Sequence, residues 1–149
     1  MGRLILLVVV ALLAVAGYTA FRNSQQRAAA GSAAASGHAG VTLFSKMTYK
    51  EAVEASKGKL LVVDATATWC PPCQMMERDT WPDPTLTSWV KDNGVAVQID
   101  VDQDPTSARD LKISAMPTVI LFRDGKELGR TQGYMTASEM LSWLTTTAG

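Results

Sequence analysis

An uninterrupted apolar run, Leu-Leu-Val-Val at residues 60–63, narrows the choice of fold more than any other segment. A strand with one face in solvent alternates apolar and polar residues. Because this run shows no alternation, we expect both of its sides to face other hydrophobic residues, as in a strand buried on both faces. The segment therefore predicts a central strand of a sheet with helices on each side.

Helical and strand patterns alternate around this segment. Capping boxes at Thr48 with Glu51 and at Thr136 with Glu139 predict the starts of two helices, and Asp-Gly at 124–125 predicts a hairpin turn. The expected strands are 41–44, 60–63, 95–101, 119–122 and 126–133; the expected helices are 48–58, 70 to the interruption at 81–82, 83–93, one from 104 and one from 136. This order predicts one α/β domain with a central mixed sheet flanked by helices.

The composition fits a single globular domain. Of 149 residues, 47% are hydrophobic and 19% charged, unlike a disordered chain. Lys plus Arg and Asp plus Glu each number 14, so the basic surface of a nucleic-acid-binding protein is not expected. Two cysteines and one histidine, His38, are too few for a scaffold of several disulfides, for most zinc sites or for histidine-based catalysis.

Residues 1–21 are expected to direct the chain to a membrane. No charged residue occurs from 4 to 21, and 4–16 consists almost entirely of Leu, Val, Ile and Ala, which predicts an N-terminal hydrophobic helix. The uncharged stretch is barely long enough to span a bilayer. We favour an uncleaved membrane anchor; the alternative is a signal peptide cleaved near Ala14-Val15-Ala16.

Residues 22–40 differ in composition from both neighbours. They are rich in Ala, Gly and Ser and have no apolar periodicity, which is typical of a flexible tether. His38 falls in this segment, so we expect it to be exposed and without a catalytic role. The folded domain is therefore predicted to comprise residues 41–149.

The chemistry is expected at Cys70 and Cys73, a CxxC pair between the apolar strand and a helix. The unpaired N–H groups and partial positive charge of a helix N-terminus favour thiolate over thiol. Pro71 and Pro72 are tolerated there because first-turn residues need no intrahelical N–H partner. Helix geometry predicts that Cys70 is outermost and is the attacking nucleophile, whereas Cys73 lies one turn inward and resolves the mixed disulfide.

Two other uses of the pair are considered. A structural disulfide, or two buried free thiols, would also account for two cysteines. Mononuclear metal binding needs two further ligands, and the domain has neither another cysteine nor a suitably placed histidine. We therefore expect no metal site.

Asp100, Asp102 and Asp104 begin a pattern that resembles a calcium-binding loop. Such a loop needs Gly at its sixth position and Glu at its twelfth. This chain has Pro105 and Leu111 there, so we expect a solvated strand end and not a calcium site.

The motif around the cysteines resembles the thioredoxin family. Asp64 lies six residues before Cys70, Trp69-Cys70-Pro-Pro-Cys73 follows a buried strand, and Met116-Pro117-Thr118 opens a later strand. The resemblance covers about 41–144 and implies a thioredoxin fold and thiol-disulfide exchange. It also implies a cis Pro117 against the CxxC, where the backbone at Met116 pairs with a bound substrate.

The same resemblance predicts a substrate-binding surface. Trp69, Pro71, Pro72, Met116 and Pro117 are assigned to it by their place in the motif. From the sequence alone, Trp69 could equally belong to the core.

Asp64 stands at the end of the apolar strand. If it is buried there, the ionised carboxylate is disfavoured, so its pKa rises and it can act as an acid or base. The resemblance implies that Asp64 assists proton transfer at Cys73. An alternative is an Asp at the sheet edge with its carboxylate in solvent. Thioredoxins often have a lysine near this Asp, where this chain has Gln98.

The residues after Cys73 resemble a narrower group, the C-terminal thioredoxin-like domain of DsbD-type transmembrane reductases, through Glu77, Thr80 and Asp83. Gln74 stands where thioredoxins commonly have Lys. The resemblance implies a membrane-tethered, extracytoplasmic (periplasmic) reductase of protein disulfides. Such an enzyme needs no organic cofactor, but a membrane-bound electron donor must reduce it again. The alternatives are a redox-inactive binding module and a thiol-based copper(I) carrier.

Overall fold

The computed structural model describes residues 43–149, which belong to one compact unit, Gly40–Gly149. The hydrophobic helix predicted within 1–21 and the tether predicted at 22–40 lie outside the described residues. Within 43–149, no helix is long and apolar enough to cross a membrane. The described residues fall within the domain predicted at 41–149.

In the described part of the chain, four strands form one mixed sheet in the order β2-β1-β3-β4. The strands are β1 (Leu60–Thr66), β2 (Gly94–Asp100), β3 (Thr118–Arg123) and β4 (Lys126–Gln132). β1 pairs with β2 in parallel and with β3 antiparallel, and β3 pairs antiparallel with β4. All seven residues of β1 are buried, which confirms the prediction of a central strand covered on both faces.

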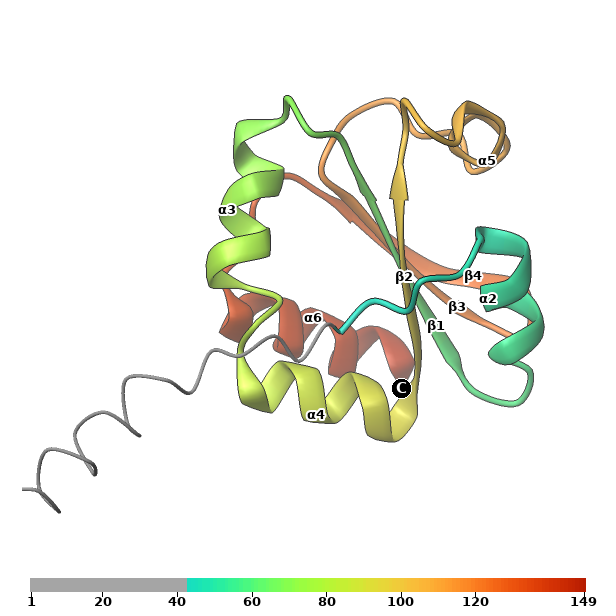
Figure 1. Ribbon diagram of the computed structural model, residues 1–149. Coiled ribbons are helices and arrows are strands. Elements are labelled where there is room, and N and C mark those ends of the chain that lie inside the picture. Colours follow the sequence, from blue (N-terminus) through green and yellow to red (C-terminus); the bar gives the residue numbers. More distant parts are fainter. Residues whose placement is uncertain (1–42) are drawn as a thin grey trace, which may run out of the picture. The chain divides into compact units, whose positions relative to one another are not determined.

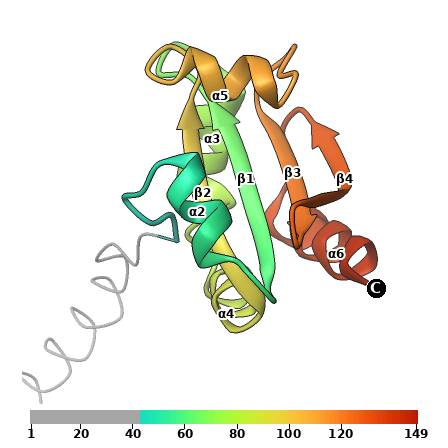
Figure 2. The same cartoon turned by 90° about the vertical axis from the view of Figure 1, so that its right-hand side faces the viewer.

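Within residues 43–149, five helices cover the two faces of the sheet (Figures 1 and 2). They are α2 (Tyr49–Ala55), α3 (Pro71–Asp79), α4 (Pro84–Asn93), α5 (Pro105–Asp110) and α6 (Ala137–Ala148). One core cluster joins side chains of α3, α4 and α6 to one face of the sheet. A second cluster joins α2 and the segment after α5 to the other face. The result is a three-layer α/β domain of the predicted class.

The local signals at helix and strand ends are confirmed. Thr48 and Thr136 each form a complete capping box at the start of α2 and α6. Asp124 and Gly125 have φ of 50° and 77°, the left-handed conformations that a tight hairpin between β3 and β4 requires.

The strand predicted at 41–44 is wrong for the residues described. Leu43 and Phe44 are not in a strand, although Leu43 is buried in the core and the Phe44 ring packs edge-on against Trp81 at 5.1 Å. Beside β2, Ser45 N–H donates to the Ala96 carbonyl at 3.1 Å. An apolar run can thus be buried by side-chain packing without joining the strand ladder.

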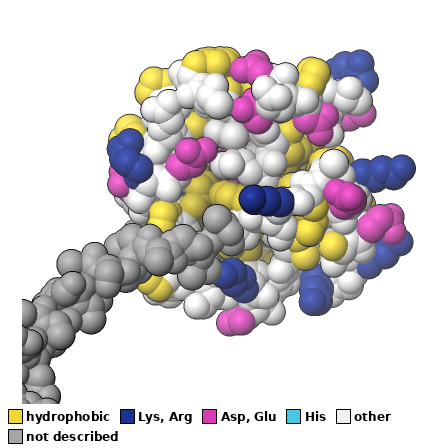
Figure 3. All heavy atoms as spheres, in the orientation of Figure 1, with side chains coloured by type: hydrophobic (Ala, Val, Ile, Leu, Met, Phe, Trp, Pro, Cys, Tyr) yellow, Lys and Arg dark blue, Asp and Glu magenta, His cyan; other side chains and the backbone are white. Residues whose placement is uncertain are grey.

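Charged side chains are spread over the surface in Figure 3. On the face drawn there, Lys and Arg are interspersed with Asp and Glu and do not form one basic area. This distribution agrees with the equal numbers of acidic and basic residues in the chain.

Candidate active site

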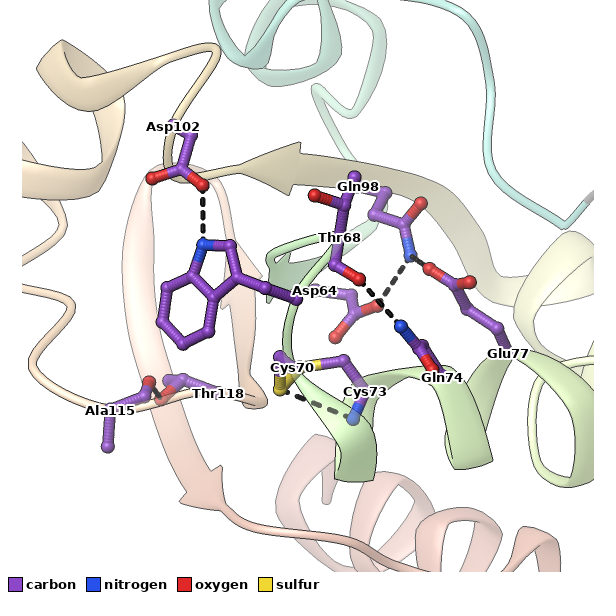
Figure 4. Close-up of a disulfide and its surroundings, with 11 residues drawn as sticks. Asp64, Thr68, Cys70, Cys73, Gln74, Glu77, Gln98, Asp102, Ala115 and Thr118 are labelled. Atoms are coloured by element: carbon purple, nitrogen blue, oxygen red, sulfur yellow. Dashed lines mark hydrogen bonds between the residues drawn. A yellow bond between two sulfur atoms is a disulfide. The ribbon is translucent and has the colours of Figure 1, made fainter.

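The cysteine pair lies at the junction between β1 and α3. Cys70 is the N-cap of α3, and Pro71 and Pro72 fill its first turn. Cys70 and Cys73 form a disulfide with an S–S distance of 2.03 Å (Figure 4). The structure thus places both predicted redox cysteines at a helix N-terminus.

The start of α3 acts directly on the Cys70 sulfur. The backbone N–H of Cys73 donates to Cys70 Sγ at 3.3 Å, within the turn where N–H groups lack helical partners. The positive end of the helix dipole lies at the same place. Both effects favour a negative charge on Cys70 once the disulfide is reduced.

The prediction that Cys70 is the more accessible cysteine is wrong for this oxidised state. Cys70 and Cys73 are each 3% exposed. The two cysteines pack with Ala67, and the partly buried Val101 and Met116 lie against them. Helix position alone therefore does not separate the two thiols by exposure, because neighbouring segments cover both.

Asp64 is a buried residue of β1 near this pair (Figure 4). It is 2% exposed, so the alternative of a carboxylate in solvent at the sheet edge is wrong. Oδ2 accepts a hydrogen bond from Gln98 Nε2 at 3.0 Å, whereas Oδ1 has no hydrogen-bond partner. Oδ1 points toward the cysteine pair in Figure 4.

Burial raises the pKa of Asp64 to about 7. The hydrogen bond from Gln98 opposes this rise, and the negative charge of Glu77 adds to it. The indole N–H of Trp81 is also buried and makes no hydrogen bond of good geometry, yet it faces Asp64 closely enough to favour the ionised carboxylate. A group with a pKa near neutrality exchanges protons readily at physiological pH.

Trp69 is exposed and held by an acidic side chain. It is 62% exposed, so the alternative of a core position is wrong. Its Nε1 donates to Asp102 Oδ2 at 2.7 Å. This role of Asp102 is not predictable from the sequence, because the two residues are 33 positions apart and no local pattern links them.

The segment before β3 completes the site. The Met116–Pro117 peptide bond is cis, and Pro117 is buried with its carbonyl accepting from Gly133 N–H at 2.9 Å. Met116 packs against the cluster that contains both cysteines. Of the predicted site residues, Asp64, Cys70 and Cys73 lie on β1 and at the helix start that follows it, and Met116 comes from the segment before β3.

The acidic pattern at 100–104 is used for local structure. Asp102 binds Trp69, Asp104 caps α5, and Asp100 Oδ1 accepts from the Asp102 N–H at 2.9 Å. In the part of the chain that the structure describes, no group of three or more His, Cys, Asp or Glu side chains is arranged to hold a metal ion.

Comparison with known proteins identifies the family. A thioredoxin-like domain family matches residues 46–148, most of the chain. The chain belongs to the thioredoxin family. With its Cys70–Cys73 disulfide, this thioredoxin-like protein is a thiol-disulfide oxidoreductase.

Individual thioredoxins show the extent of the similarity. Thioredoxin H2-1 from Oryza sativa subsp. japonica is 37% identical over 118 residues, which cover 76% of this chain and 80% of that protein. Chloroplastic thioredoxin Y1 from Arabidopsis thaliana is 40% identical over 86 residues, covering 56% of this chain and 46% of that protein. The crystal structure of thioredoxin NaTrxh from Nicotiana alata has a TM-score of 0.57 and 32% identity, covering 69% of this chain and 87% of that one.

Proposed function

We propose that this thioredoxin-like protein is a membrane-tethered reductase of protein disulfides that works outside the cytoplasm. The observation that carries the proposal is the arrangement of three features around the cysteine pair. Cys70 Sγ accepts the Cys73 N–H at the start of α3, the two sulfurs form a disulfide, and the buried Asp64 points a carboxyl oxygen toward them (Figure 4). This arrangement favours a thiolate at Cys70 and supplies a nearby group that takes up a proton.

The reaction needs only these groups. In the reduced enzyme, the Cys70 thiolate attacks one sulfur of a substrate disulfide, and the other substrate sulfur leaves as a thiolate. Asp64 then takes the proton of the Cys73 thiol, and the Cys73 thiolate attacks Cys70 Sγ. The second substrate thiolate leaves as the Cys70–Cys73 disulfide closes. Two electrons pass from the enzyme dithiol to the substrate, which becomes a dithiol.

The substrate surface surrounds the cysteine pair. The exposed Trp69 indole, fixed by Asp102, offers an apolar face beside Cys70. Pro71 and Pro72 form the adjoining first turn of α3, and the backbone at Met116, before cis Pro117, pairs with an extended substrate segment. These residues bind the backbone and apolar side chains next to the target disulfide.

The N-terminal sequence supports the proposed location of the protein, and that location suits a membrane-bound donor of electrons. The uncharged segment from residue 4 to 21 anchors the chain, and 22–40 tethers the domain on the extracytoplasmic side, where exported proteins carry disulfides. After each turnover, a membrane-bound dithiol donor supplies two electrons to the Cys70–Cys73 disulfide. The resemblance around Glu77 to DsbD-type reductases supports this relay.

The reduction potential of the Cys70–Cys73 couple tests the direction of the reaction. Equilibration of the full chain with defined dithiothreitol buffers is expected to give a value near that of thioredoxin, about −270 mV. A value between about −180 and −120 mV, as in isomerases and oxidants, would overturn the reductase assignment. Absence of any reversible two-electron couple would overturn the enzymatic function itself.

The tether is tested separately. Mass spectrometry of the membrane-bound protein is expected to find an N-terminus that retains residues 1–21. External protease applied to intact cells with a permeabilised outer envelope is expected to digest residues 43–149. A mature N-terminus near residue 17, or a domain protected until the inner membrane is lysed, would contradict the anchored or the extracytoplasmic part of the proposal respectively.

A further inference from the structure

Gln98 occupies an unusual place between two carboxyl groups. It lies on β2 directly opposite Asp64 of β1 and is half-buried. Its Nε2 lies 3.0 Å from Asp64 Oδ2 and 3.3 Å from Glu77 Oε1. One amide nitrogen thus donates its two hydrogens to two carboxylates, one buried and one exposed (Figure 4).

We propose that Gln98 is a positioning residue for thiol-disulfide exchange, which ties the buried carboxyl of Asp64 to the surface carboxyl of Glu77 and sets how readily Asp64 holds the proton that it takes from Cys73. The inference rests on the proposed function, in which Asp64 accepts that proton. Gln98 itself touches neither the cysteines nor the substrate, so it acts through Asp64.

The chemistry of an amide suits this position. When Asp64 is ionised, Gln98 Nε2 donates to it, as observed. When Asp64 is protonated, rotation of the amide lets Gln98 Oε1 accept the Asp64 O–H instead. A lysine would stabilise only the carboxylate, and an apolar residue would leave Oδ2 as unpartnered as Oδ1.

The other groups around Asp64 leave this control to Gln98 and Glu77. From α3, Glu77 contributes a negative charge; from the segment after α3, Trp81 contributes an indole N–H; and from β3, the opposing residue is the apolar Val119. Among the described residues, no cation contributes to the pKa of Asp64. The charge at Glu77 therefore acts on Asp64 without a compensating positive charge, and Gln98 holds Glu77 in range.

The test follows the titration of Asp64 in the full oxidised chain through its carboxyl ¹³C chemical shift. Gln98→Lys is expected to lower the Asp64 midpoint by about one pH unit or more, since an opposite charge at hydrogen-bond distance favours the carboxylate. Gln103→Lys is the matched control: it adds the same charge at an exposed loop position after β2, without contacting Asp64, and is expected to shift the midpoint by less than about 0.3.

Glu77→Gln provides an independent measurement, because Glu77 is exposed and its replacement does not threaten folding. Removal of the negative charge is expected to lower the Asp64 midpoint, and this shift is expected to shrink by at least about half when Gln98 is replaced by Met. This comparison of Glu77→Gln with and without Gln98→Met tests the role of Gln98 even if Gln98→Lys does not fold. Equal shifts from Gln98→Lys and Gln103→Lys, or an effect of Glu77→Gln that is independent of Gln98, would overturn the proposal.

The pH dependence of turnover distinguishes a failure of this inference from a failure of the proposed function on which it rests. The pH dependence of disulfide reduction is expected to move with the Asp64 titration across these variants. A rate profile that stays fixed while the titration moves would overturn the positioning role of Gln98. Failure of the proposed function looks different: the unmodified protein would reduce no protein disulfide at any pH.

Discussion

The two faces of the sheet are built from the same strands but differ in that β1 contributes a buried carboxyl group to only one of them. On the face toward α2, Leu61 and Val63 of β1 join an entirely apolar cluster. On the face toward α3, α4 and α6, Leu60 and Val62 are followed by Asp64, where the alternation of β1 calls for a third apolar side chain. The polar residue is thus placed on the face that also carries the CxxC helix.

This difference concentrates the unfavourable burial of polar atoms at one point. Within residues 43–149, the buried side-chain N and O atoms without a hydrogen-bond partner are Asp64 Oδ1 and Trp81 Nε1, both on the α3 side. A buried polar atom left wholly without a partner is destabilising by about 1 to 3 kcal/mol, and the approach of the Trp81 N–H to Asp64 offsets part of this cost. The α3 face therefore gives up stability next to the reacting sulfurs, whereas the β1 side chains that face α2 are apolar.

The largest expected effect comes from replacing the reacting cysteines on the α3 side, which removes the chemistry of the site. Cys70→Ser is expected to reduce disulfide-reductase turnover by about a thousandfold or more, because a hydroxyl cannot replace the thiolate nucleophile. Insulin reduction, followed by turbidity, measures the rate. Cys73→Ser is the matched variant: it keeps Cys70 and is expected to accumulate a mixed disulfide with substrate, detectable on non-reducing gels.

The two cysteine variants could also give the reverse result, which would contradict the assigned roles. If Cys73→Ser abolished adduct formation while Cys70→Ser trapped substrate, the roles assigned to the two thiols would have to be exchanged. Full cellular function of Cys70→Ser would instead support a redox-inactive binding module.

The second prediction removes the polar group that makes the two faces unequal. Below about pH 4, Asp64 is protonated in both folded and unfolded states and contributes no pH dependence. As pH rises from about 4 to the folded pKa of about 7, the unfolded state loses its proton while the folded state keeps it, so stability falls. Asp64→Asn abolishes this fall and is expected to gain up to about 4 kcal/mol relative to the unmodified protein above pH 7.

Urea denaturation of the oxidised protein at several pH values measures this gain. The same variant is expected to reduce disulfides more slowly, because Cys73 loses its proton acceptor. A stability difference that is constant from acidic to alkaline pH would contradict a buried, titrating Asp64.

The third prediction compares neighbours of the same residue type on the two faces. Val62 and Val63 are 1% and 0% exposed, so Val62→Ala and Val63→Ala are each expected to lower the free energy of unfolding by about 2 kcal/mol. Val62 shares a face with Asp64, and its truncation admits solvent closer to the carboxyl. Only Val62→Ala is therefore expected to lower the Asp64 midpoint, as read from its ¹³C titration; equal shifts in both variants would remove the distinction between the faces.

Much of the fold was predictable because its signals are local. The apolar run at 60–63, the capping boxes at Thr48 and Thr136, and the Asp-Gly turn all depend on residues close in sequence. The strand expected at 41–44 failed for the opposite reason. Whether Leu43 joins a ladder or packs as coil depends on the edge of β2, more than fifty residues away.

The positions of several candidate site residues in the fold were predictable, whereas their contacts were less so. The position of Cys70 and Cys73 at a helix start and the burial of Asp64 follow from neighbouring sequence. The equal burial of the two cysteines depends on Val101 and Met116, which come from distant loops. Contacts made across the fold leave no periodic pattern, and this is why Asp102 was assigned only to a solvated strand end.

The smallest expected effect concerns that contact between Asp102 and Trp69. Asp102→Ala removes the 2.7 Å hydrogen bond to Trp69 Nε1, but the indole is 62% exposed, so water replaces the lost acceptor and stability changes by less than about 0.5 kcal/mol. The freed ring samples more rotamers and must be ordered again when substrate binds, which is expected to raise KM about threefold with kcat unchanged.

Asp110→Ala is the matched control, since it removes an exposed carboxylate paired with Arg109 and leaves Trp69 untouched. Equal changes in KM for the two variants would assign the effect to net charge; a change confined to Asp102→Ala, and abolished when Trp69 is also replaced by Ala, would assign it to the orientation of the indole.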